Sequence, residues 1–287
     1  MLHFVEPERR LTQHWPLLLR AACKRAGQHQ DFWLTIPWQD STTPTLERYQ
    51  RLFNFATAQR PLTSYFLPIQ RAQLYCMLKS SFGFSPVGLI HLQNKMSCQQ
   101  HALMNVANTE PLQLSTNVQL LPQAPNEPLI CRFSSYLHPK LTIFPTCPAE
   151  LPAVLLSCDS DYLIKRGNTA SGQVKQVEPA ADSAVDSWHV SANAGRQYAR
   201  VSGDFNPIHL TNITARLLGM RQAIIHGMHT VARVEASLSD RRAPLNSLNA
   251  QFKRALPLGN TARLFLHEPG VGSVWQDNTL VLQFDYC

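Results

Sequence analysis

The chain has 287 residues, of which 44% are apolar and 16% charged, and its formal net charge at pH 7 is +7. This composition excludes a disordered chain, the length allows two modest domains, and no apolar stretch approaches the length of a membrane span. The positive charge favours an anionic partner: a phosphate-bearing cofactor, an acidic carrier protein, nucleic acid or a membrane surface.

The cysteines and the N-terminus indicate the compartment. The seven cysteines are scattered and form no C-x-x-C pair, so free thiols in a reducing cytoplasm fit better than disulfides, a zinc site or a redox motif. Glu6 and Glu8 argue against a transit peptide, because such peptides are poor in acidic residues. We therefore expect a cytoplasmic protein with an ordinary helix over residues 1–27.

The N-terminal half, residues 1–165, reads as helices followed by strands. The patterns predict a helix over 46–55, capped by one of three threonines, and an apolar helix over 72–82 that carries Leu74, Met77 and Leu78 at helical spacing. Strands are predicted over 32–38, 87–93, 117–121, 129–137, 151–158 and 162–165.

A stretch rich in Gly, Ser, Ala, Asp and Gln, residues 166–187, predicts a linker. The C-terminal half, residues 188–287, then repeats the order of elements. Helices are predicted over 194–201, 211–218 and 227–238, and strands over 188–190, 249–253, 262–267, 272–275 and 279–286.

The two halves also match weakly in sequence. Tyr49-Gln50-Arg51-Leu52 resembles Tyr198-Ala199-Arg200-Val201, and Ile69-Gln70-Arg71 falls where His226-Gly227-Met228 falls. The separation grows from 149 to 157 residues between these two matches, so the second half carries about eight extra residues. This indicates a duplicated unit in which each buried helix is wrapped by a sheet.

The extra residues lie in the segment Gly203-Asp204-Phe205-Asn206-Pro207-Ile208-His209. Asn206-Pro207 marks a turn, because a residue before proline is disfavoured in helical geometry. Asp204 just before this bend and His209 just after it can point into one cavity. A carboxylate beside an imidazole is the minimum equipment for moving protons at neutral pH.

The whole string resembles the signature of the MaoC-like hydratases, the (R)-specific enoyl-thioester hydratase/dehydratase family. The match comprises Tyr198, Val201 to Asp204, Asn206 to His209 and Ala215, and His226-Gly227-Met228 resembles the family's second landmark. The resemblance implies an α+β tandem (double) hot-dog fold, with an antiparallel sheet around a central helix in each half. Residues 1–165 would form a non-catalytic repeat and residues 188–287 the catalytic one.

The resemblance also implies roles. Asp204 and His209 would be catalytic, holding the reacting water and exchanging protons, and the N–H of Gly227 would polarise the thioester; tight helix packing is the alternative for this glycine. Asn206 would fix the loop, with a local Asx-turn as the alternative. His226 would anchor the loop, and Met228 and His229 would line the substrate pocket, His229 standing where many relatives have tryptophan.

The implied activity is that of an (R)-specific 3-hydroxyacyl-thioester dehydratase, or trans-2-enoyl-thioester hydratase, acting on acyl-CoA or acyl-ACP in fatty-acid metabolism. Coenzyme A or phosphopantetheine would enter only as part of the substrate, with no other cofactor. A metal is not expected, because a zinc site at His209, His226 and His229 lacks an acidic or thiol ligand at recognisable spacing.

The sequence leaves the binding partners and two alternative functions open. Six basic residues surround the active segments and could meet the substrate's phosphates or simply be solvated: Arg196, Arg200, Arg216, Arg221, Lys253 and Arg254. No nucleic-acid motif and no membrane segment is present, and a homodimer is left open. The alternative functions are a hot-dog acyl-thioesterase, disfavoured because thioesterases of this shape lack the Asp-x-Asn-Pro-x-His string, and a non-enzymatic acyl-carrier-binding protein.

Overall fold

The computed structural model describes residues 2–5, 24, 26–55, 60–86, 88–107, 110–124, 127–140, 153–164, 179–180, 183–239 and 245–287. The chain divides into two compact units. The first unit comprises Met1–Ser41 and Tyr65–Ala170, and the second comprises Thr42–Ser64 and Ser171–Cys287. Within the described ranges, every helix is too short or too polar to cross a membrane.

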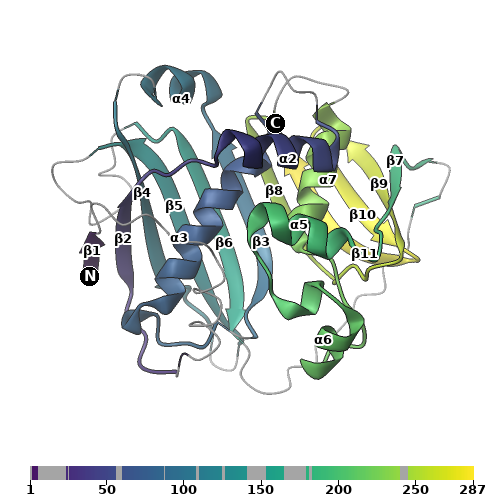
Figure 1. The fold of residues 1–287 in the computed structure, drawn as a ribbon, viewed down its shortest axis with the longest axis horizontal. Helices are drawn as coiled ribbons and strands as arrows, with labels where there is room; N and C mark the ends of the chain where they lie inside the picture. The colour runs from purple at the N-terminus through teal and green to yellow at the C-terminus, as the bar shows by residue number, and fades with distance from the viewer. Residues whose placement is uncertain are drawn as a thin grey trace. The chain divides into compact units, whose positions relative to one another are not determined.

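The first unit is a sheet covered by a helix (Figure 1). Its strands lie in the order β1-β2-β4-β5-β6-β3, all antiparallel except the parallel β1 and β2. They are β1 (Leu2–Val5), β2 (Phe32–Pro37), β3 (Ile90–Cys98), β4 (Leu112–Leu120), β5 (Leu129–Pro139) and β6 (Leu156–Ile164). Helix α3 (Phe66–Leu78) contacts β4, and a short helix α4 (Gln100–Ala107) follows β3.

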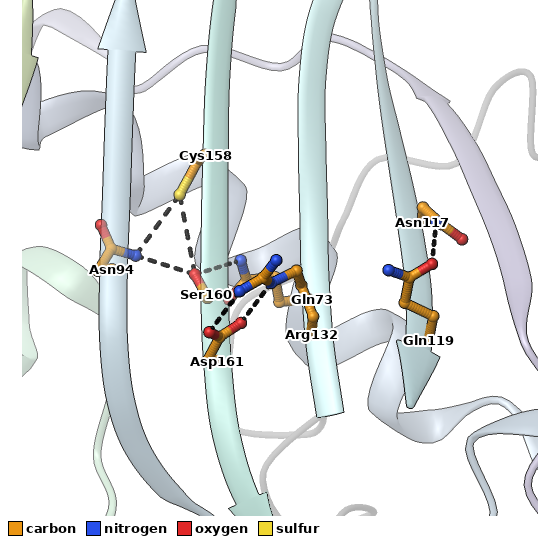
Figure 2. Close-up of polar contacts among 8 residues, drawn as sticks. All are labelled: Gln73, Asn94, Asn117, Gln119, Arg132, Cys158, Ser160 and Asp161. Carbon is orange, nitrogen blue, oxygen red and sulfur yellow. Dashed lines mark hydrogen bonds and ion pairs between the residues drawn. The ribbon is translucent and has the colours of Figure 1, made fainter. Parts of the chain in front are cut away.

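The buried face of α3 is partly polar. Gln73 is 1% exposed and donates to the hydroxyl of Ser160 on β6 at 2.9 Å, and the same hydroxyl accepts from Asn94 on β3 (Figure 2). Leu74 is only half-buried. The predicted apolar stripe is therefore displaced by one position, because this hydrogen-bonded network satisfies polar groups that would otherwise be costly to bury.

The second unit is a sheet around a buried helix. Its strands follow the order β7-β9-β10-β11-β8, all antiparallel. They are β7 (Asp186–His189), β8 (Ser247–Phe252), β9 (Thr261–Glu268), β10 (Val271–Gln276) and β11 (Thr279–Tyr286). The helices are α2 (Thr43–Phe53), α5 (Ala194–Ser202), α6 (Asn212–Leu217) and α7 (Gly227–Ser239), with 3₁₀ turns η1 (Leu62–Tyr65) and η5 (Pro207–His209).

The strand orders confirm the predicted duplication. Without β1, each unit has five antiparallel strands. Numbered along the chain within each unit, these strands lie across the sheet in the same order, 1-3-4-5-2. A helix precedes the buried helix in each repeat, α2 before α3 and α5 before α7. This is the α+β hot-dog arrangement that the sequence predicts.

The units and the predicted domains divide the chain at different points. Contacts group residues 42–64, which hold α2, with the second unit, whereas the prediction assigned them to the N-terminal repeat. Helix α2 contacts α5 and α7. Most of the predicted linker over 166–187 lies outside the described residues, and residues 186–187 belong to β7.

Three predicted elements of the first unit differ in the structure. Residues 2–5 form β1 and not a helix, and residues 6–23 lie outside the described ranges. Helix α3 begins at Phe66 and not at residue 72. Pro68 is tolerated in its first turn, because the N–H that proline lacks would have no intrahelical partner there. The two strands predicted over 151–158 and 162–165 are one strand, β6, whose Asp161 receives two hydrogen bonds from Arg132 at 2.7 and 2.8 Å (Figure 2).

Candidate functional site

The signature loop leaves α5 through a left-handed residue. Gly203 has φ of 78° and its N–H donates to Ala199 O at 2.7 Å, which ends the helix. Asp204 N–H then donates to Ser202 Oγ at 3.1 Å, and Asp204 Oδ1 accepts from Asn206 N–H at 3.1 Å. The carboxylate is thereby oriented by its own loop, with its side chain 21% exposed.

Asn206 holds the turn that follows. Its carbonyl oxygen accepts from His209 N–H at 3.0 Å, and its side-chain oxygen caps η5 by accepting from Ile208 N–H at 3.4 Å. The side chain therefore makes the local Asx-type contact that the sequence leaves as an alternative.

A glycine that the sequence analysis did not single out lets α5 approach this turn. A Cβ atom on Gly195 would lie 1.8 Å from the carbonyl oxygen of His209. Only a residue without a side chain fits there, so Gly195 sets the position of His209. The contact spans fourteen residues, and local pattern analysis gives no signal for it.

His209 is buried and fixed in one tautomer. Its Nδ1 lies 2.9 Å from Ile224 O, and because a carbonyl can only accept, Nδ1 carries the proton and Nε2 keeps a free lone pair. Burial lowers the pKa of this imidazole below its usual value, although the Asp204 carboxylate and the bond to Ile224 oppose that shift. His209 is therefore a neutral proton acceptor at pH 7.

His226 stacks on His209, with ring centroids 3.8 Å apart. Its Nε2 donates to the carbonyl oxygen of Asp204 at 2.9 Å and lies 4.0 Å from that residue's Oδ2. Burial, followed by the neighbouring His209, lowers its pKa to about 3. His226 thus ties the start of α7 to the loop as a neutral donor.

Gly227 opens α7 and packs tightly. A Cβ atom here would lie 2.7 Å from Cε1 of Phe252 on β8. A packing requirement thus accounts for the glycine, and its place in the first turn also puts it at the positive end of the helix.

Met228 and His229 are 5% and 6% exposed. The His229 ring contacts Phe53 and Tyr198 edge-on, at centroid distances of 5.0 and 5.7 Å. Burial, followed by Arg233, lowers its pKa to about 3. His229 therefore lies in an aromatic cluster with residues of α2 and α5.

The loop gathers one set of groups with metal-ligand chemistry. One side-chain atom each from Asp204, His209 and His226 lies within 4.8 Å of the others, whereas His229 is not part of this set. Ligands of a tetrahedral zinc ion lie roughly 3.3 Å apart for bonds near 2.0 Å. His226 Nε2 already serves as a donor to Asp204 O. The arrangement is better suited to proton transfer than to a closed metal site.

A second residue without a sequence signal is Glu235, in the middle of α7. It is 2% exposed and accepts hydrogen bonds from Leu62 N–H at 2.6 Å, from Thr63 N–H at 2.9 Å and from the Thr63 hydroxyl at 2.5 Å. Burial raises its pKa, and these hydrogen bonds oppose the shift. Glu235 thus fastens η1 to the central helix.

A cleft of about 290 Å³ lies along the same helix. The Phe53 ring that contacts His229 also lines this cleft. Arg233 beside it stacks on Trp188 and donates to Asp186 Oδ2 at 3.4 Å. The lining is largely polar and comprises Phe53, Asn54, Val185, Asp186, Arg233, Ala236 and Ser237. Such a surface is unsuited to an apolar acyl tail.

Comparison with known proteins points to one family. Residues 176–280 match the model of the MaoC like domain. A segment of 110 residues, 37% of this chain, is 32% identical to 3-hydroxyacyl-thioester dehydratase X of Mycobacterium tuberculosis and covers 39% of that protein. A segment of 120 residues, 39% of this chain, is 33% identical to the fatty acid synthase beta subunit aflB of Emericella nidulans and covers 6% of it.

The fold is similar over a longer range. The crystal structure of HtdX of Mycobacterium tuberculosis superposes with a TM-score of 0.65 at 19% identity, covering 88% of this chain and 98% of that one. The matched sequence segments themselves span well under half of the length of the curated relatives. The segment that matches the MaoC like domain, residues 176–280, contains Asp204, His209 and Gly227, and the chain shares its hot-dog fold with the mycobacterial structure.

Proposed function

We propose that this protein is a hydro-lyase that interconverts (3R)-3-hydroxyacyl thioesters and trans-2-enoyl thioesters, with Asp204 and His209 as its catalytic pair. The observation that carries the proposal is the state of His209. Its Nδ1–H is held by Ile224 O, its Nε2 lone pair is free, and burial keeps the ring neutral beside the Asp204 carboxylate. The mycobacterial relative is named as a 3-hydroxyacyl-thioester dehydratase, which supports the reaction class.

Dehydration breaks the Cα–H bond and the C3–O bond of the substrate and forms the Cα–C3 double bond. One group takes the α proton, and one proton goes to the departing hydroxyl, which leaves as water. The pair can do both, because the proton that one member removes from Cα is then passed to the departing hydroxyl, which leaves as water. The protein then ends in the protonation state in which it began.

Hydration is the reverse reaction and needs a positioned water. The side-chain atoms of Asp204 and His209 lie within 4.8 Å of each other. One water can therefore hydrogen-bond to both, since each such bond is about 2.8 Å long. The assignment of the α proton to one member of the pair stays open.

The negative charge that develops on the thioester oxygen needs a donor. Gly227 lies in the first turn of α7, where N–H groups lack intrahelical acceptors and the helix dipole is positive. We assign the donor role to its N–H, with Asn206 and His226 holding the loop and Met228 and His229 packing behind it. The packing of Gly227 against Phe252 does not conflict with this role.

The substrate class is an acyl thioester on coenzyme A or on acyl carrier protein, in fatty-acid metabolism. No further cofactor is required, because the reaction only moves protons and water. We place the protein in a reducing compartment such as the cytoplasm, because its seven cysteines are scattered along the sequence and form no C-x-x-C pair.

The test is hydration of crotonyl-CoA, followed by the loss of enoyl-thioester absorbance and by chiral analysis of the product. Asp204→Asn and His209→Ala should each lower kcat by ~10²–10⁴-fold. The exposed residues Asp277 and His189 provide matched controls, Asp277→Asn and His189→Ala, which should keep full activity. Release of free thiol would identify a thioesterase instead, and a (3S) product would exclude the proposed stereochemistry.

A further inference from the structure

The helix α6 that follows the turn with His209 carries large apolar side chains that are exposed. Ile213, Leu217 and Leu218 are 74%, 81% and 50% exposed. Among the described residues eight large apolar side chains are exposed, and these three fall within six residues of the chain. Ile213 and Leu217 are one turn apart and share a face of α6. Clustered exposure of this kind marks an interaction surface.

The surface is held on an ordered scaffold. Thr214 Oγ1 donates to Pro207 O at 2.7 Å, which joins α6 to η5 and so to His209. Asn212 Oδ1 accepts from Ala223 N–H at 2.8 Å, and Thr211 Oγ1 caps the helix through Thr214 N–H at 3.1 Å. The exposure of the apolar residues is therefore not caused by fraying. A partner bound to α6 would be held next to the signature loop, which carries Asp204 and His209 (Figure 1).

The same region is strongly basic. Between Ser191 and Gln222 the only acidic residue is Asp204, which lies in the candidate site, whereas four arginines are present: Arg196, Arg200, Arg216 and Arg221. All four are exposed, and no ion pair joins any of them to another described residue. Backbone carbonyls hold two of them, since Arg196 donates to Leu210 O at 2.7 Å and Arg216 to Arg221 O at 3.3 Å.

We infer that α6 is the docking site for an acidic helix of the carrier protein that bears the acyl thioester. Ile213, Leu217 and Leu218 would form the apolar centre of the interface, and Arg216 and Arg221 would meet carboxylates at its rim. This inference rests on the proposed function and selects a protein carrier over free coenzyme A. The coenzyme A part of a small thioester is polar, so it would not be expected to bind through three exposed apolar side chains on the surface of α6.

Charge decides against a second copy of this chain as the occupant. A two-fold symmetric contact would bring each arginine-rich face against itself, and like charges in an interface are repulsive. An acidic partner relieves that repulsion and is also steered toward the loop over long range.

The test compares one acyl group on two carriers. Crotonyl thioester is supplied on coenzyme A and on a purified acidic acyl carrier protein, and kcat and KM are measured for the unaltered protein, Ile213→Ser, Leu217→Ser and Arg221→Glu. The variants should raise KM for the carrier-linked substrate about tenfold or more, because apolar anchors and rim charges act on binding. For Ile213→Ser and Leu217→Ser, kcat/KM on crotonyl-CoA should stay within twofold. The matched controls are Met104→Ser, which removes another exposed apolar side chain, and Arg48→Glu.

A direct binding measurement separates this inference from the proposed function. Titration of the same carrier protein, loaded with a saturated acyl group, should show binding that weakens with salt and is lost in Leu217→Ser. The docking site would be overturned if the α6 variants affected both substrates equally, or if they bound the carrier protein as tightly as the unaltered protein does. Neither result would contradict the proposed function, which is tested by the activity of the unaltered protein on crotonyl-CoA. Binding of α6 to phosphatidylserine vesicles, or a dimer that Leu217→Ser dissociates, would also overturn it in favour of those occupants.

Discussion

The substitution Gly195→Ala tests how the fold positions His209, the proposed catalytic histidine. In the present structure the added Cβ would lie 1.8 Å from His209 O, and real Cβ contacts essentially never fall below 3.0 Å. Helix α5 and the turn must therefore separate by at least 1.2 Å, the difference between these two distances. Because the clash is with backbone, no side-chain rotation can relieve it.

The size of the effect follows from that displacement. Misplacing a catalytic group by 1 Å can cost about 10²-fold in rate, so kcat for hydration should fall by about that factor. Overpacking of this kind costs ~1–3 kcal/mol, and each kcal/mol lowers the Tm of a protein of this size by roughly 2–4 °C. We therefore expect Tm to fall by about 2–12 °C.

The measurement is hydration kinetics together with thermal unfolding. Gly27→Ala is the matched control, because a Cβ there meets nothing within 4 Å, and it should change neither quantity. If Gly195→Ala keeps its activity within threefold and its Tm within 1 °C of the unaltered protein, the close approach of α5 to His209 does not hold.

Three further outcomes are expected. Gly227→Ala should reduce activity through its clash with the ring of Phe252, and adding Phe252→Ala should restore much of it; a double variant as inactive as the single would contradict the packing account. The pKa values of His226 and His229 are depressed to about 3, so the unfolded chain binds more protons than the folded one below pH 6.5, and Tm should fall as pH is lowered from 6.5 toward 3. A Tm that stays level over this range would count against buried neutral rings. Glu235→Gln places an amide donor against the Leu62 and Thr63 donors, so the free energy of unfolding in urea should fall by ~1–3 kcal/mol with little effect on KM. An unchanged urea midpoint would refute the role of Glu235 in holding η1.

The sequence predicts the second unit better than the first. The strand predicted over 279–286 has the same bounds in the structure, since alternating apolar residues and the preceding Asp-Asn turn mark it clearly. In the first unit, strands β4 and β6 carry polar residues on buried positions, such as Ser115 and Ser160. Hydrogen bonds between strands satisfy these groups, and a search for apolar alternation cannot detect such strands.

The same distinction holds in the site. The proximity of the Asp204 and His209 side chains could be predicted, because both residues lie in one short loop. Gly195 and Glu235 could not, because their roles depend on partners at a distance along the chain: His209 in the first case, and Leu62 and Thr63, more than 170 residues away, in the second. Local sequence patterns cannot predict such long-range contacts.

The crossing of the chain between the two units has a consequence for synthesis on the ribosome. Helix α2 leaves the ribosome early, yet its buried residue Phe53 contacts Tyr198 on α5 and His229 on α7, which are made well over a hundred residues later. The nascent α2 therefore lacks these two partners while the second segment of the first unit, Tyr65–Ala170, is translated. A fragment that starts at residue 171 would lack this helix altogether, so the second unit is expected to need the N-terminal part of the chain in order to fold.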